Sequence, residues 1–251
     1  MTIQPSAGRL ATMTWPAVAE AAGAWLLAIP VGSTEQHGPH LPLATDALVA
    51  ETVAARLARA RSDVVVAPAL AYGASGEHAA FAGTLSIGMA ALRGIIVELV
   101  RSADAFAGSI LVNGHGGNHD ALAAAADQLR AEGRRVLVWS PNRTAIERAG
   151  PFRVDAHAGR FETSIMLAIA PEMVRMDRAE AGDPRPVADL LDIMRRDGIA
   201  GVTRIGVLGD PAGATAEEGE ALLVALTHDL VDAVAAWTKR AGTEPLGVEA
   251  R

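Results

Sequence analysis

Short, almost fully apolar runs alternate along the chain with longer segments whose apolar residues recur every three or four positions. Three of these runs have the length of strands and end before glycine or proline, namely Trp25–Val31, Val64–Ala67 and Ser109–Asn113. Apolar runs of this length are typical of strands buried on both faces. The intervening segment Asp46–Arg61 has helical spacing and a carboxylate in its first turn, which the helix dipole favours. This order predicts a mostly parallel sheet covered by helices on both faces.

The rest of the chain extends the same pattern. We expect a fourth strand over Arg135–Trp139, with helices over Ala90–Phe106 and from Asn118, as N-cap, to Glu132. Further helices are predicted over Phe161–Ala170, Val187–Arg196 and Thr215–Arg240, with one more strand within Val202–Asp210. The sequence has no linker and no internal repeat, so we expect a single domain over residues 1–251.

The residue types that the chain lacks narrow its chemistry. It has no cysteine, which excludes disulfides, thiolate metal sites and a cysteine nucleophile. Lys239 is its one lysine, which disfavours Schiff-base chemistry. A net charge of −7 without a basic stripe argues against nucleic acid and anionic membranes as partners. Because neither a secretory signal nor a membrane-spanning apolar run is present, we expect a cytoplasmic protein.

Most histidines lie in glycine-rich or proline-rich segments near the ends of predicted elements. These six are His37, His40, His78, His115, His119 and His157. Two of the segments directly follow predicted strands. Because open parallel sheets bind ligands beyond the carboxyl ends of their strands, we expect a functional site there.

The first polar motif follows the strand Trp25–Val31 and contains Glu35, His37 and, after a proline-rich loop, Asp46. Residues two apart in an extended chain point to the same side, so Glu35 and His37 can reach one centre. Carboxylate and imidazole groups together suit zinc, manganese or iron(II). The alternative is that Glu35 and His37 only hydrogen-bond the loop backbone.

The second motif places His115 in a glycine turn directly after the strand Ser109–Asn113. A histidine in such a turn projects into a cleft, and the glycines let the backbone approach a ligand closely. A phosphate-binding loop is the competing interpretation, but the pattern Gly-x-Gly-x-x-Gly is broken by His119. His119 itself falls at a helix start, where a simply exposed side chain is the alternative.

A third motif combines His157 with Glu162, which lies in the first turn of the helix that follows. They are five residues apart, so they share no helical face but can approach one site from different depths. For Glu162, an ordinary helix-start carboxylate is the competing interpretation. A fourth polar pair, Glu77 and His78, lies on the long loop Leu70–Gly88, where the alternative is a solvated pair.

Two other classes of hydrolase lack their motifs in this sequence. The serine-hydrolase elbow Gly-x-Ser-x-Gly is interrupted around Ser75, because Glu77 stands in place of the second glycine. The zinc-protease motif His-Glu-x-x-His is also absent.

Taken together, the three motifs resemble those of the creatininase family. The chain has Gly-Ser-Thr-Glu-Gln-His-Gly-Pro-His-Leu-Pro-Leu with a following aspartate, then Asn-Gly-His-Gly-Gly-Asn, then Asp-Ala-His-Ala-Gly with Glu-Thr-Ser. The resemblance spans Trp25 to at least Glu162. It implies a three-layer α/β/α sandwich with a two-metal site, and a homo-oligomer. It also implies hydrolysis of C–N bonds in cyclic or simple amides, or of peptides in some members.

The resemblance also implies which residues bind metal. Glu35, His37, Asp46 and His115 would hold two divalent ions per chain, zinc, iron(II) or manganese, with Asp46 as the bridging ligand. Creatininase itself has a glutamate at the position of Gly117, so the fifth ligand here would be Glu162. This departure argues against creatinine as the substrate.

Roles in catalysis follow from the same resemblance. His157 matches the catalytic histidine of the family and would transfer a proton to the leaving nitrogen. Backbone N–H groups around Gly116 and Gly117 would stabilise the oxyanion. Glu77 and His78 would contact the substrate at the mouth of the pocket.

Two further segments, residues 72–78 and 206–215, resemble the subgroup of the family found in mycofactocin biosynthesis. That subgroup trims a modified precursor peptide, which implies a peptidase acting at a C-terminal dipeptide. The alternative is a small-molecule amidohydrolase of a cyclic amide or formamide. A non-catalytic metal-binding protein is disfavoured, because binding alone needs neither a bridging aspartate nor His157.

Overall fold

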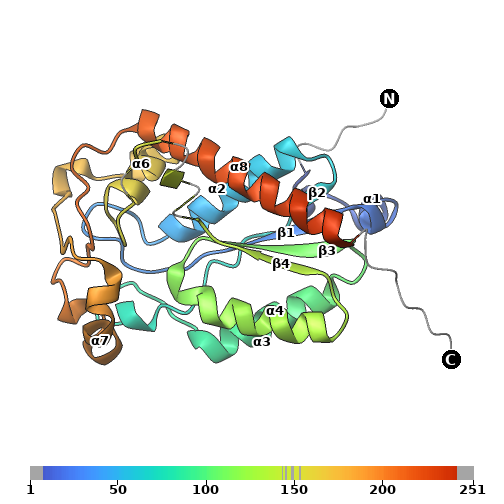
Figure 1. Cartoon of the computed structure of the whole chain (residues 1–251), viewed down its shortest axis with the longest axis horizontal. Helices are drawn as coiled ribbons and strands as arrows, with labels where there is room; N and C mark the ends of the chain where they lie inside the picture. Colours follow the sequence, from blue (N-terminus) through green and yellow to red (C-terminus); the bar gives the residue numbers. More distant parts are fainter. Residues whose placement is uncertain (1–7, 143, 145, 148–149, 153, 242–251) are drawn as a thin grey trace.

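The sheet has four parallel strands in the described part of the chain, in the order β2-β1-β3-β4. The computed structural model describes residues 8–142, 144, 146–147, 150–152 and 154–241. The strands are β1 (Leu26–Val31), β2 (Val64–Val66), β3 (Gly108–Asn113) and β4 (Val136–Trp139), and every pairing between them is parallel. Figure 1 shows helices on both faces of this sheet. The predicted α/β fold with a parallel sheet is therefore confirmed.

The predicted helices are all present, with ends shifted by at most a few residues. They are α2 (Thr45–Ala60), α3 (Gly88–Ser102), α4 (His119–Ala131), α6 (Arg160–Ile169), α7 (Val187–Asp197) and α8 (Ala216–Ala241), and the short α1 (Trp15–Ala19) precedes them. The 3₁₀ helices are η2 (Leu10–Thr12), η3 (Ala22–Ala24), η4 (Gly76–His78), η5 (Gly116–Asn118), η6 (Pro171–Met173), η7 (Met176–Arg178) and η8 (Ile199–Gly201).

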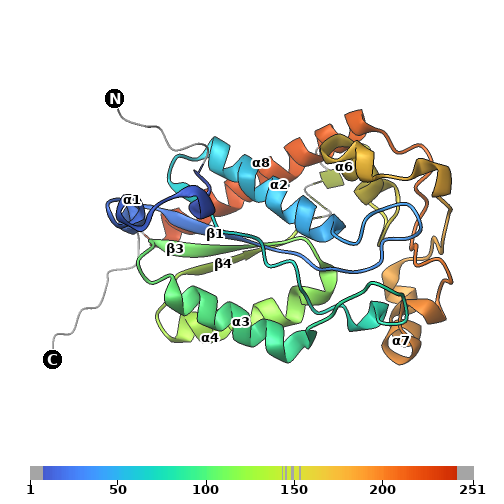
Figure 2. The ribbon, with the colours of Figure 1, turned by 180° about the vertical axis from the view of Figure 1, so that it is seen from behind.

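Alternate side chains of each strand enter two separate cores. Leu26, Ala28 and Ile110 pack with α2, α6 and α8, whereas Leu27 and Leu111 pack with α3 and α4 on the other face. This alternation follows from the two-residue repeat of a strand. Figures 1 and 2 show the resulting layers, with α3 and α4 on one side of the sheet and α2 and α8 on the other. The predicted three-layer α/β/α sandwich is therefore also confirmed.

The strand predicted within Val202–Asp210 is wrong. Only an isolated antiparallel bridge forms there, in which the N–H groups of Leu208 and His157 donate to each other's carbonyl oxygens at 2.9 and 3.1 Å. Gly206 and Gly209 have φ values of +80° and +148°, which break the extended conformation. This segment holds His157 in place instead of extending the sheet.

Helix α8 is the one described helix long and apolar enough to cross a membrane by length and composition. Such a property is weak evidence by itself, because core helices share it. In this structure α8 packs against α6, α2 and β4, and it buries Leu222, Leu226, Leu230 and Val234.

The carboxyl ends of β1 and β3 lie side by side, with Val31 opposite Asn113. Strand β2, which follows β1 in the chain, lies on one side of β1, and β3 lies on its other side. The loops that follow β1 and β3 therefore leave this point in different directions. In open parallel sheets, ligands bind where the strand order reverses in this way. The N-terminus of α2 also packs here. A side chain on Gly32 would collide with the backbone of Ala47, so only glycine admits this approach.

Replacing Ile110 by alanine is expected to lower the free energy of unfolding by about 2–5 kcal/mol, because the side chain is fully buried and would leave a cavity. The matched change Ile95→Ala, at a half-exposed position on α3, should alter it by less than about 0.5 kcal/mol. Urea denaturation of both variants measures the difference. Equal effects would contradict the assigned core.

Candidate active site

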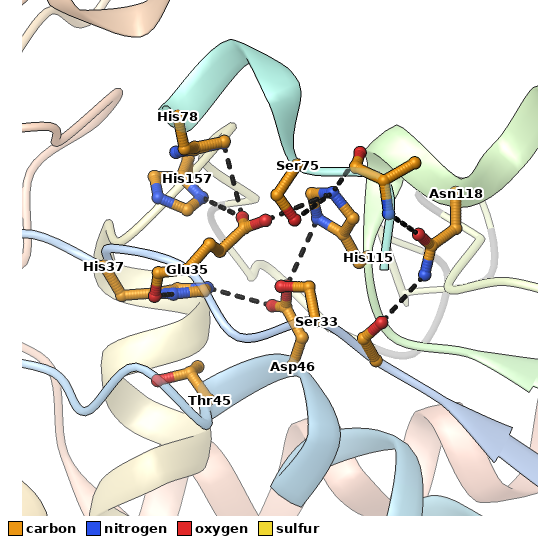
Figure 3. A network of polar contacts seen from close by, with 12 residues as sticks. Ser33, Glu35, His37, Thr45, Asp46, Ser75, His78, His115, Asn118 and His157 are labelled. Atoms are coloured by element: carbon orange, nitrogen blue, oxygen red, sulfur yellow. Dashed lines mark hydrogen bonds and ion pairs between the residues drawn. The ribbon is translucent and has the colours of Figure 1, made fainter. Parts of the chain in front are cut away.

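The carboxylate of Asp46 lies at the centre of the site (Figure 3). It belongs to the first turn of α2 and is buried. Its Oδ1 atom lies 2.9 Å from Nε2 of His37, and its Oδ2 atom lies 3.2 Å from Nδ1 of His115. The hydroxyl of Ser33 donates a hydrogen bond of 2.7 Å to Oδ2. Each oxygen of Asp46 therefore faces a different imidazole, as a bridging carboxylate requires.

One group of possible metal ligands consists of Glu35, Asp46 and His115. Glu35 follows β1 and is completely buried, and its Oε2 atom lies 3.2 Å from Nε2 of His115. Neither carboxylate oxygen of Glu35 has a hydrogen-bond partner among the described residues. An ionised carboxylate buried without hydrogen bonds is costly, and a bound cation removes that cost.

A second group consists of His37, Asp46 and Glu162. Nδ1 of His37 lies 3.1 Å from the backbone oxygen of Glu35 and donates to it, and Nε2 donates to Oδ1 of Asp46 at 2.9 Å while metal is absent. Oε2 of Glu162 lies 3.8 Å from that nitrogen and also accepts a 2.6 Å hydrogen bond from the N–H of Ala158. A backbone bond at one ring nitrogen, with the second nitrogen directed at the ligand cluster, is typical of metal-binding histidines.

Charge is balanced in the metal-free site by protons on histidine. Burial lowers the pKa of His37, but Asp46, Glu162 and Glu35 together raise it to about 10. Burial likewise opposes the charge of His115, whose pKa is nevertheless raised by Asp46 and Glu35. Burial and Asp46 raise the pKa of Glu35, but His115 and His78 outweigh them and lower it to about 2. Divalent cations among these carboxylates would replace the protons.

The donor set fits a borderline divalent metal ion. It contains carboxylate oxygens and imidazole nitrogens, which zinc, iron(II) and manganese all accept. The two oxygens of Glu35 lie 3.3 Å from Nε2 of His78 and 3.2 Å from Nε2 of His115 without a hydrogen bond, so a cation there would satisfy them. The three carboxylates and two histidines thus come together as the sequence motifs predicted.

His157 and His78 lie on the far side of Glu35 from Asp46 (Figure 3). Nδ1 of His157 is 3.9 Å from Oε1 of Glu35, and Nε2 of His78 is 3.3 Å from the same oxygen. Burial and the charges of His37 and His78 hold the pKa of His157 well below its usual range, so its ring is neutral. The prediction of His78 at the mouth of the pocket is wrong, because its side chain is buried beside Glu35.

Glu77 and Gly117 meet at the edge of the site. Oε1 of Glu77 lies 3.7 Å from Nε2 of His115, and its side chain is partly exposed. A Cβ on Gly117 would collide with Nε2 of His115 and would lie 2.6 Å from Oε1 of Glu77. No larger residue fits at position 117 in this arrangement. The neighbouring Gly116 is exposed and faces open space.

Asn118 connects three loops of the site. Its Oδ1 accepts a 2.9 Å hydrogen bond from the N–H of Ala74, and its Nδ2 donates to the oxygens of Gly32 at 3.0 Å and Asn113 at 3.2 Å. Asn118 holds the predicted N-cap position of α4, but its side chain makes no capping hydrogen bond, because these loop contacts occupy it. The position of Asn118 in the second motif pointed to a role in the site, but the sequence alone does not show which residues its side chain contacts.

Two other histidines lie away from the clustered ligands. His40 is buried, and its Nε2 contacts the hydroxyl of Thr163 at 3.0 Å. His119 is exposed at the start of α4 and lines the cavity next to the cluster.

A cavity of about 350 Å³ adjoins the cluster and is lined by Asp46, His115 and Glu162 on one side. Its apolar wall includes Val49, Ile146 and Phe161. A larger hollow of about 470 Å³ lies beside residues 184–188 and contains none of the clustered ligands. A mostly apolar cavity with a few polar groups is typical of a substrate site, so we place the reaction in the smaller cavity.

The sequence was compared with known families and proteins. The family model of creatininase, described as creatinine amidohydrolase, matches residues 11–234. The mycofactocin precursor peptide peptidase of Mycobacterium ulcerans strain Agy99 is 47% identical over 234 residues, covering 90% of this chain and 87% of that protein. The protein of the same name from Mycobacterium tuberculosis H37Rv is 49% identical, covering 84% and 85%. The creatinine amidohydrolase of Pseudomonas putida is 31% identical, covering 85% and 90%.

Solved structures show the same similarity in three dimensions. A crystal structure of creatinine amidohydrolase matches with a TM-score of 0.76 at 29% identity, covering 92% of this chain and 98% of that chain. A mutant creatininase complexed with creatine matches with a TM-score of 0.77 at 28% identity, covering 96% of this chain and 100% of that chain. The fold therefore extends over nearly the whole length of these proteins.

Loading the metal-free protein with Zn²⁺ is expected to release protons, because His37 and His115 carry protons at neutral pH and must lose them to bind metal. Protons compete with the metal, so the affinity should fall as the pH decreases. Calorimetric titration in two buffers of different ionisation enthalpy measures the release. His115→Ala should lower the amount of bound metal, whereas His228→Ala on α8 should not. Binding without proton release would contradict the arrangement.

Replacing Asn118 by aspartate is expected to lower the free energy of unfolding by roughly 1–3 kcal/mol, because a carboxylate oxygen would face the oxygens of Gly32 and Asn113. Thermal and urea denaturation measure this change. Asn142→Asp, the same amide-to-carboxylate change at an exposed position after β4, serves as the control because its Oδ1 still accepts from the N–H of Thr144. A stability equal to that of the control would refute the role of Asn118.

Proposed function

Because the chain belongs to the creatininase family of amide-bond hydrolases, we propose that it is a peptidase that uses two divalent metal ions to trim the mycofactocin precursor peptide. The observation that carries this proposal is the shared carboxylate of Asp46. Its two oxygens face two buried ligand groups, one containing Glu35 and His115 and the other containing His37 and Glu162.

The choice of substrate rests on the relatives. The mycofactocin precursor peptide peptidases are 47–49% identical to this chain, whereas the creatinine amidohydrolase of Pseudomonas putida is 31% identical. The close approach of Gly117 to Glu77 supports the same choice, because it excludes the glutamate that creatininase has at this turn. We propose release of the C-terminal dipeptide. Hydrolysis of a cyclic amide or formamide remains the alternative that the experiment below distinguishes.

Five side chains would hold the metal ions, which are zinc, iron(II) or manganese. Bound there, such ions lower the pKa of a water molecule and polarise a carbonyl oxygen. Asp46 orients both ligand groups, and Ser33 fixes the direction of its carboxylate. The buried, neutral ring of His157 lies 3.9 Å from Glu35, where it can move a proton to the leaving nitrogen.

The surrounding residues would bind the substrate. The apolar wall of Val49, Ile146 and Phe161 can hold a side chain of the peptide next to the ligand groups. The backbone N–H groups of Gly116 and Gly117 can stabilise the developing oxyanion. Glu77, partly exposed and 3.7 Å from His115, would contact the substrate at the edge of the site, whereas His78 is buried beside Glu35.

Several broader properties belong to the same proposal. We place the whole of residues 1–251 in one domain and the protein in the cytoplasm, acting on a peptide or small amide rather than on nucleic acid or membranes. A homo-oligomer is supported by large exposed apolar side chains, among them Trp15 and, on α3, Met89 and Leu99.

Incubation of the metal-loaded enzyme with the modified precursor peptide should release a C-terminal dipeptide, detected by mass spectrometry. His157→Gln is expected to lower kcat by about 10²–10⁴-fold with unchanged metal content, because only the proton transfer is lost. His228→Ala, far from the cluster, should retain activity. Cleavage of creatinine or a formamide but not of the peptide would refute the proposed substrate, and full activity of His157→Gln would refute the role of His157.

A further inference from the structure

We propose that Gln36 is a positioning residue that fixes opposite hydrogen-bonding roles for two histidines beside Glu35. In this arrangement His78 presents an N–H group to the site, whereas His157 presents a lone pair. The tautomers follow from contacts within the protein, and their use in peptide hydrolysis rests on the function proposed above.

The direction of the Gln36 side-chain amide is fixed by two backbone groups. Its Oε1 accepts a 2.9 Å hydrogen bond from the N–H of Gly38, and its Nε2 donates to the oxygen of Gly206 at 3.0 Å. A flipped amide would place oxygen against oxygen and nitrogen against N–H. Gly206 has a φ of +80°, and a Cβ there would collide with Oε1 of Gln36, so glycine is required for this contact.

The hydrogens of this amide can be assigned by counting. Nε2 of Gln36 carries two hydrogens and has three neighbours, which are the oxygen of Gly206, Nδ1 of His78 at 2.8 Å and Nε2 of His157 at 3.0 Å. Nε2 of His157 also lies 2.8 Å from the backbone oxygen of Gln36. A carbonyl oxygen only accepts, so Nε2 of His157 must carry the hydrogen. The two amide hydrogens therefore go to Gly206 and to His78.

These assignments give the two rings opposite roles. Because Nδ1 of His78 accepts from Gln36, its hydrogen is on Nε2, which lies 3.3 Å from Oε1 of Glu35. Because Nε2 of His157 donates, its lone pair is on Nδ1, which lies 3.9 Å from the same oxygen. One donor and one acceptor thus face the same edge of the ligand cluster.

This difference selects His157 for the proton transfer. As the oxygen of the attacking water bonds to the amide carbon, one water proton moves to Nδ1 of His157. When the C–N bond breaks, the same proton passes to the leaving nitrogen, which gives an amine and a carboxylic acid, and the acid then releases the second water proton to solvent. His78 can donate a hydrogen bond to an oxygen at this edge, but it has no lone pair there to accept the proton.

The ¹⁵N spectrum of the zinc-loaded enzyme tests the tautomers without substrate. The ring signals are assigned with His78→Gln and His157→Gln, and each ring should carry its hydrogen on Nε2. In Gln36→Met, His157 should keep this tautomer because its backbone acceptor remains, whereas His78 should become a mixture. Gln128→Met on α4 should change neither. A hydrogen on Nδ1 of either ring in the wild-type protein would overturn the proposal.

Kinetics test the consequence for hydrolysis. Gln36→Met is expected to lower kcat by about 10–100-fold, with KM and metal content unchanged. The reason is that the substitution disturbs only His78, which no longer holds its N–H group toward the site. Gln36→Leu, which also lacks the amide hydrogens and adds no charge, serves if Gln36→Met does not fold, and it should give the same mixture of His78 tautomers. An unchanged kcat in a folded variant with an altered His78 signal would refute the positioning role. Because the spectra need no substrate, failure of the proposed peptidase activity would leave the tautomers independently measurable.

Discussion

The buried carboxylate of Asp46 is the interaction on which the site depends. It is held between His37 and His115 and is oriented by the hydroxyl of Ser33. Three negative groups could not be buried together without compensating charge, and burial makes this demand stronger. The same arrangement explains why Glu35 has no hydrogen-bond partner among the described residues and why the histidines hold protons when metal is absent. A metal centre is the simplest way to satisfy all of these groups.

The sheet brings these groups together because the carboxyl ends of β1 and β3 are neighbours. Helix α2 begins directly over them, so its first-turn carboxylate enters the same space as the loops that follow both strands. Glycine at position 32 permits this close approach, and Asn118 links the loops across the gap. The outer walls of the cavity are separate from these groups, and there the apolar side chains of Val49 and Phe161 border the cluster.

Much of this arrangement could be predicted from sequence because the signals are local. Strand-length apolar runs gave the parallel sheet, and the motif residues Glu35, His37 and Asp46 lie close together in the chain. The role of Gln36 could not be predicted, since one of its partners, Gly206, is 170 residues away. The burial of His78 depends on how a glycine-rich loop folds back, which periodicity does not describe. The false strand within Val202–Asp210 arose because its apolar residues pack into two different hydrophobic clusters, and Leu208 forms an isolated bridge with His157 instead of joining the sheet.

The order of the ligands along the chain has a consequence for how the centre is completed during synthesis. Glu35, Asp46 and His115 all precede the middle of the chain, whereas the group of His37 and Asp46 lacks Glu162 until a later segment has emerged. The bridge between His157 and Leu208 forms later still. A growing chain can therefore assemble one ligand group before the other exists. Glu162 and His157 lie in the middle third of the chain, whereas Leu208, which pairs with His157, lies in its C-terminal third, so the cluster is finished only late in synthesis.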